Sequence, residues 1–278
     1  MKFIRYGMAG QERPGLMAPD GSYRDLSGLV DDITAANVQS ATLADLADKW
    51  SSLPTLPQDS RLGAPIAGVG NFYAIGLNYE DHAKESGMPI PEHPVLFYKS
   101  TASICGPNDD IIKPEGSDAL DWEVELGIVI GTRAQRVSVE QARSHILGYL
   151  TVNDVSERTW QLQRGGGQWG KGKSHETFGP LGPWLVTADE VPNPGELDLW
   201  LTVNGETMQR GNTRTLIFNV DEIVADLSQY LTLMPGDVII TGTPPGVGMG
   251  MKPPRYLQRG DVVELEVQGL GRQRQRVV

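Results

Sequence analysis

Two glutamates lie two residues apart within an apolar stretch of the chain. The segment DWEVELGIVIG carries Glu123 and Glu125 in a strong β-strand pattern, so both side chains point to the same face of a sheet. Neighbouring carboxylates repel each other, and a bound divalent cation would offset that repulsion and the desolvation cost. A solvated surface pair is the alternative. Gly127, Val129 and Gly131 continue the glutamate face, however, which places the pair at the mouth of an interior.

A third acid ends the next strand pattern along the chain. Asp154 closes the segment GYLTVND, and a strand returning alongside the first would bring its carboxylate to the glutamate pair. Three oxygen ligands without Cys or His suit Mg²⁺, Mn²⁺ or Ca²⁺ and leave coordination positions open for water or substrate. The sequence therefore predicts a metal site at Glu123, Glu125 and Asp154.

A histidine and a glutamate lie three residues apart in the segment NYEDHAKESG. His82 and Glu85 are adjacent on one face if this segment is helical. A carboxylate beside an imidazole raises its basicity and fixes its tautomer, which suits a general base that takes a proton from water. An exposed pair on a polar helix is the structural alternative. Glycines on both sides of this short helix would allow it to act as a lid over a substrate.

Basic, amide and hydroxyl side chains follow in the second half of the chain. Arg158 and Gln161 share one face if the chain turns helical after the strand, and an arginine can bind a substrate carboxylate through two hydrogen bonds. Lys171 and Lys173 lie in the glycine-rich segment QRGGGQWGKGKSHETFGP, and either could approach the acids as a counter-charge. Thr243 follows the apolar strand pattern DVII within TGTPPGVGMG, at a strand end where ligands often bind.

Strand patterns dominate the chain from Phe72 to the C-terminus and must position these side chains. Two helical stretches interrupt them, YEDHAKESG at 79–87 and the amphipathic VDEIVADLSQYL at 220–231. The expected fold class is α+β and β-rich.

The first 70 residues have a different pattern. A PDG turn at 19–21 predicts a hairpin of two short strands. Residues 31–50 have helical spacing of apolar residues, and a proline-containing linker follows them. We therefore expect a small N-terminal α/β domain over 1–70 and a catalytic domain over 71–278.

Composition excludes several classes of function. The 278 residues include 24 Lys and Arg against 35 Asp and Glu, a net charge of −11, which argues against nucleic acid as a partner. No run of about 18 apolar residues could cross a membrane. The single cysteine, Cys105, excludes an internal disulfide. Because the N-terminus lacks the apolar stretch of a secretory signal, we expect a cytoplasmic protein.

These motifs together resemble those of the fumarylacetoacetate hydrolase family. The matching stretches occur in the family's order: GLNYEDHAKESG, PVLFYKSTASICGPNDDI, DWEVELGIVIG, GYLTVNDVSERTWQ, GQWGKGKSHETFGPLGPW and PGDVIITGTPPGVG. The resemblance covers some two hundred residues from about Phe72 onward. It implies a mixed β-roll core and a homodimer or dimer-based oligomer.

The resemblance also implies roles for individual residues. It implies Mg²⁺ or Mn²⁺ held by three acids: Glu123, Glu125 and Asp154. It implies that His82 and Glu85 form a water-activating dyad on a lid, and that Lys173 assists at the metal. It implies three substrate contacts: Arg158, Gln161 and Thr243. Where family members often have Asp, this chain has Glu176, so no role is transferred to that position.

Within the family the chain is most similar to bacterial hydrolases of 2,4-diketo-3-deoxy-L-rhamnonate and L-fuconate. The similarity includes the N-terminal MKFIRYG and the segment KPPRYLQRGD near the C-terminus. It implies carbon–carbon bond hydrolysis of a small anionic diketo acid to pyruvate and lactate. Acylpyruvate hydrolysis, oxaloacetate decarboxylation and dienedioate isomerisation remain open on the same residues. A non-catalytic β-rich module that binds a cation for stability is the alternative of another class.

Overall fold

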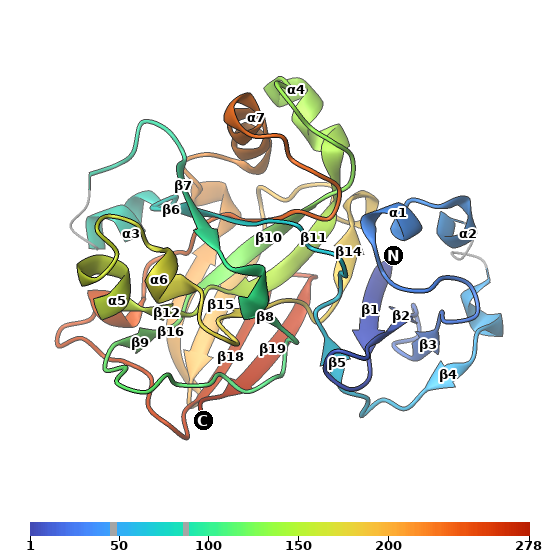
Figure 1. The fold of residues 1–278 in the computed structure, drawn as a ribbon, viewed down its shortest axis with the longest axis horizontal. Helices are drawn as coiled ribbons and strands as arrows, with labels where there is room; N and C mark the ends of the chain where they lie inside the picture. Colours follow the sequence, from blue (N-terminus) through green and yellow to red (C-terminus); the bar gives the residue numbers. More distant parts are fainter. Residues whose placement is uncertain (45–48, 86–88) are drawn as a thin grey trace.

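The computed structural model describes residues 1–44, 49–85 and 89–278, without the side chains of Ala41, Ala44 and His82. An eleven-stranded sheet runs through these residues in the order β4-β3-β2-β1-β14-β11-β10-β17-β6-β7, with β5 paired to β1 (Figure 1). Its strands are β1 (Lys2–Tyr6), β2 (Arg13–Met17), β3 (Tyr23–Asp25), β4 (Thr55–Leu56), β5 (Leu62–Gly63), β6 (Phe72–Gly76), β7 (Val95–Lys99), β10 (Val124–Ile130), β11 (Ile146–Asn153), β14 (Leu185–Thr187) and β17 (Val238–Ile240).

A four-stranded sheet and two short strand pairs complete the β-structure of the described residues. The four-stranded sheet has the order β16-β15-β18-β19, and the pairs are β8 with β13 and β9 with β12. Their bounds are β8 (Ile104–Cys105), β9 (Leu120–Asp121), β12 (Ser156–Glu157), β13 (Gly179–Pro180), β15 (Asp198–Val203), β16 (Glu206–Asn212), β18 (Val262–Val267) and β19 (Gly271–Arg276). The α+β, β-rich class expected from the sequence is confirmed.

Strand β10 lies inside the long sheet between β11 and β17 and is buried along its whole length. One face, which includes Leu126 and Ile128, packs in the same core as Leu201 and Leu265 of the four-stranded sheet. The other face contributes Val129 to a second core, which also holds residues of β1 and β17. The strand is thus apolar on both faces beyond the glutamates, as its sequence indicates.

Strand β11 returns antiparallel to β10, with Val124 opposite Asn153. The backbone N–H of Asp154 continues the ladder and donates to the C=O of Glu123 at 2.9 Å. This register is the reason that acids about 30 residues apart in the sequence meet at one end of the strand pair.

The helices are short apart from α7. Their bounds are α1 (Ala35–Val38), α2 (Ala41–Ala44), α3 (Glu80–Glu85), α4 (Val139–Ala142), α5 (Arg158–Gln163), α6 (Gly170–Lys173) and α7 (Val220–Tyr230). The predicted helices over 79–87 and 220–231 correspond to α3 and α7. Helices α4 and α6 were not predicted, because helices of four residues are too short to show apolar periodicity. Helix α5 was considered only as the condition for pairing Arg158 with Gln161.

The helix expected over 31–50 is wrong as a continuous element. The structure has α1 and α2 in its place, and residues 45–48 lie outside the described chain. Ser40 separates the two helices, because its backbone N–H and its hydroxyl both donate to the C=O of Asn37. A serine that binds a nearby carbonyl in this way competes with helical hydrogen bonding.

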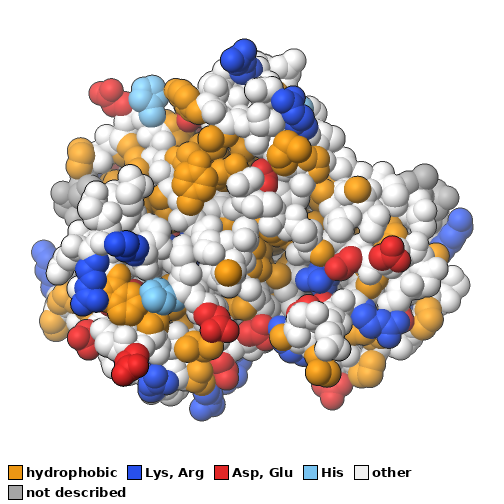
Figure 2. Space-filling view, in the orientation of Figure 1, with side chains coloured by type: hydrophobic (Ala, Val, Ile, Leu, Met, Phe, Trp, Pro, Cys, Tyr) orange, Lys and Arg blue, Asp and Glu red, His pale blue; other side chains and the backbone are white. Residues whose placement is uncertain are grey.

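The N-terminal region adds strands to one end of the long sheet. Strands β2 and β3 form the hairpin predicted at 19–21, and β1 pairs antiparallel with β14. The long sheet therefore continues from the N-terminal strands into the rest of the chain, and the domain boundary near residue 70 stays a prediction. Strand β7 forms the opposite edge of the long sheet, and Figure 2 shows hydrophobic side chains gathered between α7 and this strand.

Among the described residues, no helix is long and apolar enough to cross a membrane.

Candidate active site

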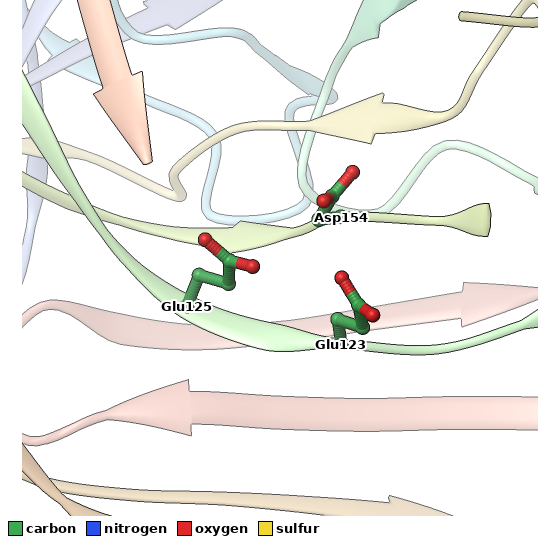
Figure 3. Close-up of side chains that lie close together, drawn as sticks. All are labelled: Glu123, Glu125 and Asp154. Carbon is green, nitrogen blue, oxygen red and sulfur yellow. The ribbon is translucent and has the colours of Figure 1, made fainter. Parts of the chain in front are cut away.

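Three acids meet where β10 begins and β11 ends (Figure 3). Glu123, Glu125 and Asp154 each offer a carboxylate oxygen, and these oxygens lie within 4.8 Å of one another. All three residues are buried. Burial, together with the charges of Asp154 and Glu123, raises the pKa of Glu125 well above its ordinary value. Clustered buried carboxylates with no Cys or His are the ligands that Mg²⁺ and Mn²⁺ accept, so the residues fit the expected cation.

The glycine loop that follows β17 orients one of these carboxylates. The backbone N–H of Gly242 donates to Oε2 of Glu125 at 2.7 Å. Gly242 has φ of +97°, a conformation that favours glycine. A β-carbon there would also lie 2.8 Å from Cβ of Asn78, so the glycine is required both for the turn and for the close approach.

Lys173, at the end of α6, supplies positive charge to the acids. Its Nζ lies 2.6 Å from Oε2 of Glu123 and 2.6 Å from Oδ2 of Asp154. Burial alone would lower the pKa of Lys173, but the two carboxylates outweigh it and raise the pKa above its ordinary value. Lys171, the other candidate, is exposed and donates to the C=O of Arg164. Only Lys173 of the two contacts the acids.

A second buried lysine was missed by the sequence analysis. Lys99 is the last residue of β7, and its Nζ lies 2.6 Å from Oδ1 of Asp154. The same Nζ donates to the C=O of Lys173 and, at 3.4 Å, to the C=O of Val155. Asp154 thus has one lysine at each carboxylate oxygen. The sequence does show a lysine at the end of the apolar run VLFYK. A lysine at that position is also typical of a strand end exposed to solvent, so the sequence does not distinguish the two.

Arg158 and Gln161 lie on one face of α5, as their spacing predicts. Arg158 Nη1 donates to Oε1 of Gln161 at 3.0 Å, and Nη2 lies 2.7 Å from Oε1 of Glu123. Its Nε donates to Oδ2 of Asp121 at 2.8 Å. Burial would lower the pKa of Arg158, but Glu123 and Asp121 outweigh it and raise the pKa.

Asp121 was also missed, although it links two parts of the site. Besides Arg158, it accepts hydrogen bonds from the backbone N–H groups of Gly248 at 2.7 Å and Met249 at 3.0 Å. Its fully buried carboxylate therefore holds the loop after β17 against the arginine.

Thr243 lies beside the acids, but its hydroxyl is used within the protein. It donates to the C=O of Val124 at 2.9 Å and accepts from Nε2 of Gln209 at 2.8 Å. A substrate oxygen that accepts a hydrogen bond from this hydroxyl would have to replace the C=O of Val124 as the acceptor.

The predicted lid helix lies against the same glycine loop. The backbone N–H of Gly246 is 3.1 Å from both carboxylate oxygens of Glu85. A β-carbon at Gly250 would lie 2.5 Å from Cδ of Glu85, so this glycine leaves room for the glutamate. The side chain of His82 lies outside the described residues, so its pairing with Glu85 stays a prediction.

Part of this set of residues lines a cavity of about 160 Å³, and Glu85 is not among the described residues of that lining. Its polar lining consists of the three acids, Lys173, Arg158, Gln161 and Thr243. Asp121 and Lys99 lie outside this lining but contact it through Arg158 and Asp154. The whole cluster then has four carboxylates, including Asp121, and three cationic side chains, including Lys99, so its formal charge is minus one. A divalent cation would make the cluster positive by one charge, which suits an anionic substrate. Glu176 lines a different hollow, with Arg5 and Arg61.

Comparison with known proteins places this geometry in context. A family model described as fumarylacetoacetate (FAA) hydrolase C-terminal matches residues 71–278. A Burkholderia lata protein assigned as a hydrolase is 55% identical over 277 residues, which cover 99% of this chain and 98% of that protein.

Solved structures match the whole chain. A 2-hydroxyhepta-2,4-diene-1,7-dioate isomerase from Mycobacterium marinum is 33% identical, with a TM-score of 0.79 and coverage of 100% of this chain and 98% of that one. A maleylpyruvate hydrolase from Sphingobium sp. SYK-6, in complex with manganese(II) and pyruvate, is 26% identical, with a TM-score of 0.83 and coverage of 100% and 99%.

Proposed function

The chain belongs to the fumarylacetoacetate hydrolase family, and from this premise we propose that it hydrolyses the C3–C4 bond of a 2,4-dioxo acid. The products are pyruvate and a carboxylic acid. The first substrate to test is 2,4-diketo-3-deoxy-L-rhamnonate or its L-fuconate counterpart, which would give lactate. The observation that carries the proposal is the cluster of three buried acids beside Lys173 and Arg158 at one cavity.

The residues have distinct tasks in this reaction. Mg²⁺ or Mn²⁺ bound by Glu123, Glu125 and Asp154 would supply Lewis-acid stabilisation of negative charge on the 2-oxo acid. The Sphingobium hydrolase, with its manganese(II) and pyruvate, supports that assignment. Arg158 and Lys173 hold the substrate carboxylate by charge and hydrogen bonding. Gln161, fixed by Arg158, presents its amide to the same cavity.

The proposed base is His82, oriented by Glu85. His82 takes a proton from water, and the water oxygen bonds to C4. The C3–C4 bond then breaks, and its electron pair passes to C3, where the adjacent 2-oxo group delocalises it. A proton delivered to C3 completes pyruvate. Every atom of the consumed water appears in the two products.

Isomerisation of a dienedioate is the second candidate, because the Mycobacterium marinum structure carries that name. An isomerase moves a double bond and a proton without consuming water, so it releases no pyruvate. That difference separates the two candidates in one assay.

The test is pyruvate release from the deoxyrhamnonate derivative, an acylpyruvate and oxaloacetate, each with Mg²⁺ or Mn²⁺ and with chelator. Metal-dependent release from either of the first two supports hydrolysis. Carbon dioxide release from oxaloacetate that survives His82→Ala would instead indicate a decarboxylase. Inactivity on all three would leave the isomerase and the non-catalytic cation-binding module. Conversion of 2-hydroxyhepta-2,4-diene-1,7-dioate, followed by its absorbance, would then indicate the isomerase, and inactivity on that acid as well would indicate the non-catalytic module.

A further inference from the structure

The part of the cavity wall that lies beyond the polar groups is made of apolar side chains. These are Ile75, Leu77, Phe97, Leu162, Trp169 and Met249. The rings of Phe97 and Trp169 are 5.1 Å apart. A β-carbon at Gly76 would overlap the ring of Trp169, so the indole lies directly on the backbone there. This apolar wall is therefore closely packed and offers a substrate no charged partner.

Both cationic side chains of the described cavity lining lie at the acid cluster. Arg158 contacts Asp121 and Glu123, and Lys173 contacts Glu123 and Asp154. The proposed reaction uses Arg158 and Lys173 for its one substrate carboxylate, and the described residues of the lining hold no further Lys or Arg for a second carboxylate.

We propose that the substrate is a monocarboxylate: a 2,4-dioxo acid whose acyl end is short and uncharged. This inference rests on the proposed hydrolysis and specifies its substrate class. A carboxylate at the acyl end would lose its hydration against the apolar wall without gaining an ion pair. The cavity is also smaller than the roughly 300–1,000 Å³ typical of sites for drug-sized ligands, which favours a chain of few carbons.

The proposed substrate class differs from the substrates named for two structures that resemble this chain. These substrates, maleylpyruvate and 2-hydroxyhepta-2,4-diene-1,7-dioate, are both dicarboxylates. The deoxyrhamnonate derivative ends in a methyl group beside one hydroxyl and so belongs to the proposed class.

The test compares two acids that differ only at the acyl end. Butanoylpyruvate ends in a methyl group, and succinylpyruvate carries a carboxylate in its place. With Mg²⁺ present, kcat/KM for pyruvate release should be at least about 100-fold higher for butanoylpyruvate. Equal values, or a preference for succinylpyruvate, would overturn the inference and leave the hydrolysis standing.

A variant of Leu162 tests the physical cause of the preference. Leu162 lines the cavity from α5 but is 53% exposed, so a long polar side chain can replace it at little cost to folding. Leu162→Lys should shift the ratio of the two kcat/KM values at least about tenfold toward succinylpyruvate. Leu162→Gln, of similar length and without charge, should not. The same shift in both variants, or none in the lysine variant, would contradict the inference.

Binding separates failure of the inference from failure of the proposed function. If neither acid releases pyruvate, the hydrolysis is wrong, but calorimetric titration of both acids into the Mn²⁺-loaded protein still measures the preference. Tighter binding of butanoylpyruvate would support the inference, and tighter binding of succinylpyruvate would overturn it.

Discussion

Burying a lysine costs folding free energy unless a carboxylate lies beside it, and this chain buries two lysines at one aspartate. Lys99 and Lys173 each contact a different oxygen of Asp154. Burial lowers the pKa of Lys99 despite the charge of Asp154, whereas the two acids at Lys173 raise its pKa. Asp154 is therefore fixed at both oxygens, and its position depends on β7 and α6 together.

The first prediction concerns Lys99→Met. Removing one partner of a buried pair should lower the free energy of unfolding by about 3 kcal/mol, because Asp154 stays buried and loses one of its two cationic partners. Denaturant unfolding measures this effect. Lys84→Met is the control, since Lys84 pairs with Glu80 on the exposed side of α3. Equal effects of both substitutions would contradict this account of Lys99.

The second prediction concerns the dyad. Glu85→Ala and His82→Ala should each lower kcat by about 10² to 10⁴ if they form the general base. Asp81→Ala, an exposed acid of the same helix, should leave kcat nearly unchanged. Steady-state kinetics on any substrate that releases pyruvate would measure this, and near-normal turnover in Glu85→Ala would count against the proposed water activation.

Sequence spacing predicted some of the site's contacts and could not predict others. Arg158 and Gln161 were paired correctly because helical geometry relates residues three apart. The choice between Lys171 and Lys173 depends on how a glycine-rich segment turns, which local sequence does not determine. Asp121 and Lys99 were missed because their partners are distant in sequence and come together only through sheet pairing.

At the scale of elements, the site depends on two strand ends and a glycine loop. Strand β10 was predictable because its apolar run is long and ends at Gly131, and α7 because its amphipathic pattern spans eleven residues. Asn219 caps α7 by accepting from the backbone N–H groups of Asp221 and Glu222. The elements that were missed or misplaced include helices of four to six residues, which depend on caps and tertiary packing more than on periodicity. They also include two-residue strands such as β4 and β5, which lie in the segment expected to be a linker.

The third prediction tests the contact between α3 and the glycine loop. Gly250→Ala places a methyl group against the carboxylate of Glu85, so the glutamate must move, and kcat should fall at least about tenfold. The melting temperature should change little, because the displaced atoms are the end of a flexible side chain. Gly28→Ala is the control, since a β-carbon there meets open space. Full activity in Gly250→Ala would show that the position of Glu85 is not critical.

At the scale of the whole molecule, the two sheets bury the acids and the N-terminal strands extend the long sheet. The α+β, β-rich class followed from strand patterns and turn composition. The order of the strands could not be predicted from these patterns, because the pairs β17–β10 and β1–β14 join segments far apart in the chain. The homodimer stays a prediction, which light scattering in solution would test.

The fourth prediction is that a divalent cation stabilises the folded chain. A ligand that binds only the native state, at a hundredfold excess over Kd, adds about 2.7 kcal/mol, and the melting temperature should rise by roughly 5 °C or more. Chelator should reverse the shift, and Glu125→Gln should reduce it. A thermal scan in Mg²⁺, Mn²⁺ and chelator measures this. Glu264→Gln, which alters a surface acid paired with Arg272, should keep the full shift.

The central claim is that water attacks C4 of a 2,4-dioxo acid, and isotope labelling tests it most directly. Butanoylpyruvate is incubated with the Mg²⁺-loaded protein in ¹⁸O-water, and the butanoate formed is examined by mass spectrometry. We expect one ¹⁸O in each butanoate released and one pyruvate for each butanoate. Addition of chelator should stop the formation of both products. Recovery of the dioxo acid uncleaved, or of butanoate without label, would contradict the proposed hydrolysis.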